Sequence, residues 1–200
     1  MIKKDQSNKI ALLWTGGKDC CLVLHLLEKQ VDYLVTLVPK NFTDDSFKAH
    51  KIPLMKEQAR KLLLPLVFIE INQPYDQGYN QGFLQLKDQY QVKTVYTGDI
   101  EYINYCCNLV ETACQTNNLE FIQPLWKKDR FELMALLFKY QIKALITWSD
   151  KQEYQDLLVG KIIDEDLIAK MQKLPIDLSG EAGEYHTMVV DCLLFDNKNS

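Results

Sequence analysis

A glycine pair set between two apolar runs constrains the fold most, in the stretch IALLWTGGKDCCLVLH (residues 10–25). The first run, Ile10–Trp14, is short and apolar, as expected of a buried parallel strand. The segment Cys21–Gln30 is apolar almost all round a helix, which predicts a buried helix. A strand that passes through Gly16 and Gly17 directly into a helix predicts the first half of a βαβ unit.

The rest of the first 120 residues repeats this alternation of strand and helix. The expected strands are Tyr33–Val38, Val67–Ile71 and Thr94–Tyr96, and the expected helices are Pro53–Leu64, Tyr79–Tyr90 and Tyr102–Thr116. Strict alternation predicts a parallel sheet with helices on both faces, in which ligands bind at the carboxyl ends of the strands. The segment Thr97-Gly98-Asp99 follows the last of these strands, so we expect it at the same edge as the glycine turn.

Beyond residue 120 the regular alternation of strand and helix ends, which predicts a smaller second part. The expected elements are an extended piece at Phe121–Pro124, a helix capped by Asp129 that runs to about Tyr140, a strand at Lys143–Thr147, a helix at Asp164–Lys173, a turn-rich loop at Pro175–Tyr185 and a final strand at Thr187–Leu193. We therefore predict an α/β protein whose two domains, residues 1–120 and 121–200, pack closely and share a cleft.

Composition excludes several classes of protein. At 47% hydrophobic and 25% charged residues, the 200-residue chain is typical of a soluble globular protein. A net charge of −4 does not favour a nucleic-acid partner. The polar start and the lack of a long apolar run predict neither a signal peptide nor a membrane span. The six cysteines include no Cys-x-x-Cys spacing, which favours a reducing cytoplasm.

The turn from Thr15 to Cys20 has the chemistry of an anion site. Glycine permits positive φ angles and lets a ligand approach the main chain closely. The first N–H groups of the following helix carry partial positive charge, and Lys18 adds a full charge. Phosphate is the anion that best suits such a turn. The Walker spacing and the Gly-x-Gly-x-x-Gly spacing of dinucleotide sites are both absent.

A second unusual stretch is SGEAGEYHTMVVDCLLF (residues 179–195). Its two glycines, Gly180 and Gly183, indicate tight backbone geometry. Glu181 and Glu184 put two carboxylates near one place, where they can hold an amine, an ammonium ion or a metal, and His186 can transfer a proton. From the residues alone, a solvated hairpin with a core histidine remains the alternative.

Several motifs, in order along nearly the whole chain, resemble those of a known family. The run TGGKDC resembles the Ser-Gly-Gly-x-Asp-Ser loop of the PP-loop ATP pyrophosphatases, and GEAGEYHT resembles the Gly-Glu-x-Gly-Glu-Tyr/Phe-x-Thr signature of the diphthine–ammonia ligase family within that class. VTLVP, AHKIPLMKEQARKLLLPL, YTGDI, FIQPLWKKDRFELM and LLVGKIIDEDLI are similar to further family segments. Three positions depart from the pattern: Thr15 replaces serine, Cys20 replaces the final serine with a weaker hydrogen-bond donor, and Lys161 replaces arginine.

The resemblance implies a parallel-sheet, Rossmann-like fold of the HUP type, with residues 1–120 as the ATP-binding domain and a smaller α/β domain, residues 121–200, that binds the acceptor. It implies ATP and Mg²⁺ as cofactors and an amide-forming ligase as the activity. ATP activates a carboxylate as an acyl-adenylate, pyrophosphate leaves, and ammonia displaces AMP. In eukaryotes and archaea the acceptor is diphthine, a modified histidine of an elongation factor. The composition fits a bacterial member, for which the acceptor is unknown.

The resemblance and the chemistry of the residues together give the expected site. The nucleotide-binding residues are Thr15, Gly16, Gly17, Lys18, Asp19, Cys20, His50, Gly98 and Asp99, and the catalytic residues are Lys18, Glu181, Glu184 and His186. Asp19 is the expected metal ligand, with a purely structural role beside the helix dipole as the alternative. His50 is alternatively an exposed loop residue, and we expect His25, Cys20 and Cys21 to pack in the core.

Two other functions remain open at this point. Because Cys20 replaces the usual serine, a protein that binds ATP as a sensor, without catalysis, remains an alternative. A tRNA-modifying PP-loop enzyme is less favoured, because the chain has neither an evident iron–sulfur motif nor a basic surface. The expected partners are ATP, ammonia and a carboxylate acceptor in the cytoplasm, without a membrane. The sequence leaves open whether the chain forms a homo-oligomer.

Overall fold

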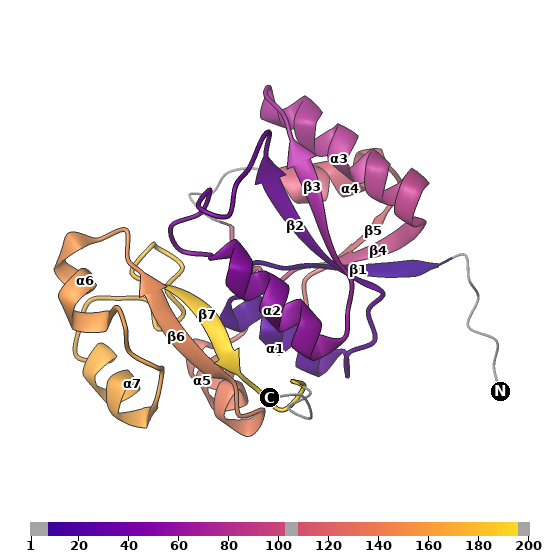
Figure 1. Cartoon of the computed structure of the whole chain (residues 1–200). Helices are drawn as coiled ribbons and strands as arrows, with labels where there is room; N and C mark the ends of the chain where they lie inside the picture. Colours follow the sequence, from indigo (N-terminus) through magenta and orange to yellow (C-terminus); the bar gives the residue numbers. More distant parts are fainter. Residues whose placement is uncertain (1–7, 103–107, 196–200) are drawn as a thin grey trace.

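The computed structural model describes residues 8–102 and 108–195, and its larger sheet has five parallel strands in the order β3-β2-β1-β4-β5 (Figure 1). The strands are β1 (Lys9–Leu13), β2 (Tyr33–Pro39), β3 (Leu66–Ile71), β4 (Val92–Tyr96) and β5 (Glu120–Ile122). The chain first adds β2 and β3 on one side of β1 and then crosses to add β4 and β5 on the other. The order therefore reverses at β1, and ligands of such sheets bind where the order reverses.

Helices cover both faces of this sheet, as the alternation predicted. Helices α1 (Lys18–Leu26) and α2 (Ile52–Leu62) lie on one face, and α3 (Tyr75–Tyr90) and α4 (Leu109–Thr116) lie on the other (Figure 1). Neighbouring residues of β1 point to opposite faces, so Leu12 joins the core under α1 and α2, and Ala11 joins the core under α3 and α4. In the part of the chain described, no helix has the length and hydropathy needed to cross a membrane.

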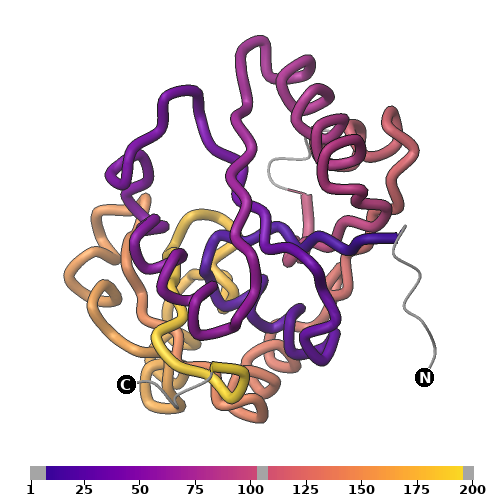
Figure 2. The backbone as a smooth tube through the Cα atoms, turned by 45° about the vertical axis from the view of Figure 1, so that its right-hand side comes forward, coloured from indigo at the N-terminus to yellow at the C-terminus, as the bar shows by residue number. Residues whose placement is uncertain are grey.

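The second part is built on a two-stranded antiparallel sheet. Strand β6 (Lys143–Trp148) pairs with β7 (His186–Asp191), and α5 (Arg130–Lys139), α6 (Gln152–Leu158) and α7 (Glu165–Met171) complete it. Strand β7 lies beside the glycine turn, where the main-chain N–H of Val189 donates to the carbonyl of Gly16 at 2.8 Å (Figure 2). One continuous core joins the two parts. A division into domains at residue 120 stays a prediction.

The sequence placed most elements correctly, misplaced the bounds of three helices and missed a fourth. Helix α1 spans Lys18–Leu26, so it begins and ends earlier than the expected Cys21–Gln30. Helix α3 begins at Tyr75, one turn before the expected Tyr79. The expected helix Tyr102–Thr116 starts too early, because Tyr102 is not helical and α4 begins at Leu109. Residues 103–107 of that prediction lie outside the described residues. The side chain of Asn108 caps α4 by accepting hydrogen bonds from main-chain N–H groups in the first turn of the helix. Helix α6 was missed because its sequence, QEYQDLL, is polar and short. The expected cap at Asp129 is confirmed.

Gln58 of α2 holds the glycine turn between the two parts. Its buried side-chain amide donates to the carbonyls of Gly16 at 2.9 Å and Val189 at 2.7 Å, and it accepts from the indole of Trp14 at 3.1 Å. Gly16 has a φ of +76°, and a Cβ there would lie 2.5 Å from the amide oxygen of Gln58. The turn is therefore fixed from behind by one side chain.

We expect Gln58→Leu to lower the free energy of unfolding by about 2–4 kcal/mol, because it leaves two carbonyls and one indole N–H buried without this partner. Urea unfolding followed by circular dichroism measures the change. The matched control is Gln89→Leu on the exposed face of α3, for which we expect a change within about 0.5 kcal/mol. An unchanged unfolding midpoint for Gln58→Leu would show that the amide does not hold the turn.

Candidate functional site

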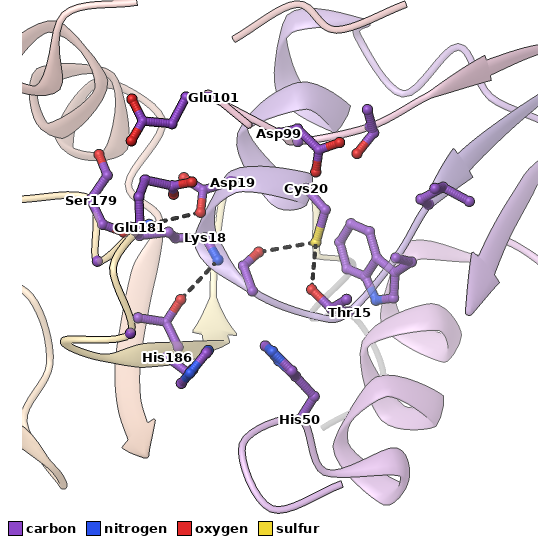
Figure 3. Close-up of a pocket in the computed structure, with 18 of the residues that line it drawn as sticks. Thr15, Lys18, Asp19, Cys20, His50, Asp99, Glu101, Ser179, Glu181 and His186 are labelled. Atoms are coloured by element: carbon purple, nitrogen blue, oxygen red, sulfur yellow. Dashed lines mark hydrogen bonds and ion pairs between the residues drawn. The ribbon is translucent and has the colours of Figure 1, made fainter. Parts of the chain in front are cut away.

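A cavity of about 1120 Å³ opens at the carboxyl ends of β1 and β4, between the two parts of the chain (Figure 3). Its wall combines the glycine turn, the end of β2, the segment after β4 and the loop before β7. Small-molecule sites in proteins usually measure about 300–1,000 Å³. The cavity is therefore large enough for a nucleotide together with a second substrate.

The glycine turn places the start of α1 at this cavity. Gly17 precedes the helix, and the N–H of Lys18 donates to the hydroxyl of Thr187 on β7 at 3.1 Å. The first turn of a helix concentrates unpaired N–H groups and the positive end of the helix dipole. Gly98, after β4, packs so closely on α1 that a Cβ there would lie 2.8 Å from the nitrogen of Cys20. The cavity therefore begins at a positive helix end.

Lys18 is a buried ammonium that joins the turn to the loop before β7. Its side chain is 3% exposed, and its Nζ donates to Asp19 at 2.7 Å and to the carbonyl of Ser179 at 2.6 Å (Figure 3). Burial alone would lower the pKa of Lys18, but the charge of Asp19 and the nearby Tyr185 raise it above its ordinary value. The ammonium therefore stays charged at neutral pH.

Two polar atoms in the cavity wall have no hydrogen-bond partner among the described residues. They are the hydroxyl of Ser179 and the Nδ1 of His50, and both are buried. An unpaired buried polar group costs free energy, so such atoms indicate a place where a ligand binds. Together with the positive helix end and Lys18, they fit a polar, anionic ligand such as a nucleotide.

The two histidines of the cavity face one another. The rings of His50 and His186 are 5.7 Å apart in an edge-to-face arrangement (Figure 3). Burial, together with the neighbouring His186, lowers the pKa of His50 to about 4, so His50 is neutral at physiological pH. The Nε2 of His186 lies 2.9 Å from a carboxylate oxygen of Asp150, which orients its ring.

Carboxylates gather on the other side of Lys18. Burial, and then the charge of Asp19, raise the pKa of Glu181 to about 7, although Lys18 opposes the shift. Burial also raises the pKa of Asp99, which accepts a hydrogen bond from Asn108 at 3.3 Å. Carboxylate oxygens are the protein ligands that Mg²⁺ uses beside phosphates. The cavity therefore holds suitable donors for a nucleotide-bound magnesium ion.

The cavity brings together most of the residues that the sequence singled out. Those that line it are Thr15, Gly17, Lys18, Asp19, Cys20, His50, Gly98, Asp99, Glu181 and His186. Gly16 lies in the same turn, but its carbonyl is directed to Val189 and Gln58. The catalytic and binding roles of these residues stay predictions.

Glu184 is the exception, and the expectation that it faces the cleft is wrong. Its carboxylate is buried and accepts from the main-chain N–H groups of Asp177 and Ala182 and from the ammonium of Lys151. Gly180 and Gly183 have φ angles of +80° and +76°, which turn the chain so that the two glutamates diverge. Glu184 therefore fixes the loop from inside, and Glu181 alone of the pair reaches the cavity.

Cys20 packs at the edge of the site, as one of its two expected roles requires, and its nucleotide-binding role stays a prediction. Its thiol donates to the carbonyl of Gly17 at 3.2 Å, and burial raises its pKa to about 11. The thiol is therefore neutral and already bonded within the turn.

Sequence reasoning missed several residues of the site. Ser179 contributes its carbonyl to Lys18, and Asp150 orients His186. Arg130 bridges Glu101 at 2.8 Å and Asp177 at 2.9 Å, so it ties the loop before β7 to the segment after β4. Asp150 follows the carboxyl end of β6, and attention to strand ends would have found it.

Comparison with known proteins gives concordant matches. The chain matches the sequence profile described as the diphthamide synthase N-terminal domain over residues 8–120, and the profile of the C-terminal domain over residues 129–199. Relatives from Mus musculus and Homo sapiens, both named diphthine–ammonia ligase, are each 25% identical over 95% of this chain and 81% of their own length. A Schizosaccharomyces pombe protein of that name is 28% identical, and this chain spans 35% of its length.

A solved structure agrees with the fold. It is described as a predicted subunit of tRNA methyltransferase from Methanocaldococcus jannaschii, and it superposes with a TM-score of 0.55 over 93% of this chain and 98% of its own. At 14% sequence identity this likeness shows the fold alone. The expected Rossmann-like α/β architecture is confirmed.

Proposed function

The chain belongs to the diphthamide synthase family, and from that premise we propose that it is an ATP-dependent ligase that forms an amide from ammonia and a carboxylate. One observation carries the proposal. The buried ammonium of Lys18 stands at the start of α1, inside a cavity of nucleotide size, and bonds to the loop that supplies Glu181. This arrangement supports a nucleotide and an acceptor meeting at this point.

We assign the polyphosphate of ATP to the turn from Thr15 to Cys20. The N–H groups of the first turn of α1 and the ammonium of Lys18 attract an anion there. In the structure Asp19 neutralises Lys18 at 2.7 Å, so a bound phosphate competes with that carboxylate for the ammonium. Asp19, once displaced, and Asp99 would hold Mg²⁺, which would offset the charge of the phosphates.

The proposed reaction has two steps. An oxygen of the acceptor carboxylate attacks the α phosphorus, the bond to the β-phosphate oxygen breaks, and pyrophosphate leaves with the electron pair. Ammonia then attacks the acyl carbon of the adenylate, AMP leaves, and one proton is lost from nitrogen. Glu181, with its pKa of about 7, is suited to accept that proton at neutral pH.

His186 is the second candidate for proton transfer. Asp150 orients its ring, and the neutral His50 faces it. This side of the cavity is remote from the carboxylate cluster in Figure 3, so we assign it to the acceptor or to the base and ribose of the nucleotide. Diphthine is the first acceptor to test, because the relatives named diphthine–ammonia ligase carry it in their names.

A second candidate is a protein that binds ATP without chemistry. Cys20 favours it, because the thiol donates to the carbonyl of Gly17 and leaves the turn without the hydroxyl of a serine at that position. The same ATP site serves both functions, so only the products distinguish them.

The test is to incubate the purified protein with ATP labelled at the α phosphorus, ¹⁵N-ammonium and either diphthine-bearing elongation factor or a panel of carboxylic acids. We expect AMP and pyrophosphate in equal amounts, with ¹⁵N in the acceptor. Hydroxylamine in place of ammonium should trap the activated acyl group as a hydroxamate. Formation of ADP would contradict the proposed bond cleavage, and ATP binding without any product would favour the sensor.

A further inference from the structure

A cluster of three soft metal-ligand side chains lies outside the cavity, in the core between α1 and the end of β7. Cys21, His25 and Cys192 are 0%, 6% and 5% exposed, and one ligand atom from each lies within 4.8 Å of the other two. Among the residues that the structure describes, this is the only such group of three histidine, cysteine or acidic side chains. The group includes no carboxylate.

The fold explains why these residues meet. Cys21 and His25 are four residues apart, so they share one face of α1. Cys192 directly follows β7, which ends at Asp191 and packs on α1. Cys192 is 167 or more positions away from the other two residues in the chain, and the junction of α1 with β7 brings it to them.

The hydrogen bonds of His25 leave one nitrogen available. Its Nδ1 lies 2.9 Å from the main-chain oxygen of Cys21, and a carbonyl only accepts, so Nδ1 carries the proton and donates. The Nε2 therefore keeps its lone pair, and it is buried with no partner among the described residues. Histidines that bind metals commonly donate their other N–H to a main-chain carbonyl in this way.

We propose that Cys21, His25 and Cys192 bind one thiophilic d¹⁰ cation, with Zn²⁺ favoured over Cu⁺. Thiolate and imidazole are the ligands that both ions prefer. Zn²⁺ binds both cysteines as thiolates, whose two negative charges balance its own, so the buried site is neutral. Cu⁺ with two thiolates leaves one negative charge in the apolar core, which is unfavourable.

The site requires only a modest rearrangement. Ligand atoms around a tetrahedral zinc ion are about 3.6–3.8 Å apart, so atoms that lie within 4.8 Å need to approach by about 1 Å. The described residues offer no fourth side chain of the usual types in this group, and a main-chain carbonyl or a water molecule would complete the coordination of Zn²⁺.

The proposed site lies directly behind the glycine turn. Cys21 follows Lys18 by three residues on α1, and β7 carries Thr187, which accepts from the N–H of Lys18. A bound ion would cross-link α1 to the end of β7. We therefore expect metal to stabilise the junction on which the turn depends, and to raise the unfolding temperature.

The experiment titrates metal-free, reduced protein with Zn²⁺ against a chromophoric competitor chelator. We expect one equivalent of Zn²⁺ to bind per chain. Cys192→Ser should weaken Zn²⁺ binding more than about 100-fold. The matched control is Cys114→Ser, a buried cysteine of the other core on α4, which should bind Zn²⁺ like the wild type. Parallel titration with Cu⁺ under nitrogen distinguishes the two ions.

Circular dichroism of each metal-free variant establishes that it is folded. Co²⁺ then serves as a second probe, because thiolate-to-cobalt absorption should appear in the wild type and weaken in His25→Gln, which retains both sulfurs. Equal Zn²⁺ affinity in the wild type and Cys192→Ser would overturn the proposal. An equal loss of affinity in Cys114→Ser would also overturn it, as would a Cys21–Cys192 disulfide in the wild type that persists in reductant and excludes metal.

Discussion

Lys18→Met is expected to lower ATP-dependent release of pyrophosphate about 100- to 1,000-fold and to weaken ATP binding, because it removes the one full positive charge buried at the start of α1. The loss is more than that of a single contact. Asp19 and Glu181 remain in a buried site without the ammonium that offsets their charge, so the site becomes repulsive to phosphate. Pyrophosphate release and calorimetric titration with ATP measure the two effects.

Two further variants test whether charge or shape is responsible. Lys18→Arg keeps the charge but places a larger group where the lysine side chain is only 3% exposed, so we expect partial recovery of ATP binding and little turnover. Lys56→Met removes an exposed lysine that pairs with Asp44, and it should behave like the wild type. Wild-type affinity for ATP in a folded Lys18→Met protein would reject the assignment of the polyphosphate to this turn.

Glu181→Gln is expected to reduce turnover by about 100-fold or more while ATP binding changes little, because the amide cannot accept a proton from the attacking ammonia. The carboxyl has a pKa of about 7 in the folded protein, raised first by burial. Wild-type turnover should therefore increase as pH rises through about 7 and the carboxylate forms. The variant should lack this limb of the pH–rate profile.

The raised pKa of Glu181 also makes the free energy of unfolding depend on pH. A carboxyl whose pKa rises from 4.5 to about 7 on folding binds more protons in the folded state than in the unfolded state between these values. Its contribution to the free energy of unfolding therefore decreases as pH rises through this window, and Glu181→Gln should remove that decrease. Glu101→Gln is the matched control, since Glu101 borders the cavity, is half-exposed and pairs with Arg130. A Glu181→Gln enzyme with the wild-type pH profile would exclude Glu181 as the base.

Local patterns sufficed to predict the glycine turn and the sheet. A short apolar strand, two glycines and a buried helix specify βα geometry without help from distant residues, and the carboxyl-edge rule then placed Gly98 and Asp99 beside the turn. The helix caps were predictable where a capping side chain preceded a periodic helix, as at Asp129. Helix α6 had no such periodicity, and only two of its residues, Tyr154 and Leu158, join the core.

The site was harder to predict where its geometry depends on long-range contacts. Nothing in GEAGEY indicates that Glu184 turns inward while Glu181 faces the cavity. Two of the donors to Glu184 are main-chain N–H groups of its own loop, and the third is the ammonium of Lys151, 33 residues away. The bond from Lys18 to Ser179 spans 161 residues and follows from the docking of β7 on α1. The expected cytoplasmic location stays a prediction.

The bond between Val189 and Gly16 has a consequence for how the protein is made. The ribosome makes the turn well before β7, so a nascent chain has the residues of the turn long before it has the strand that braces them. We therefore expect a product that stops short of β7 to hold the turn loosely, because it lacks the bonds that Thr187 and Val189 make to Lys18 and Gly16.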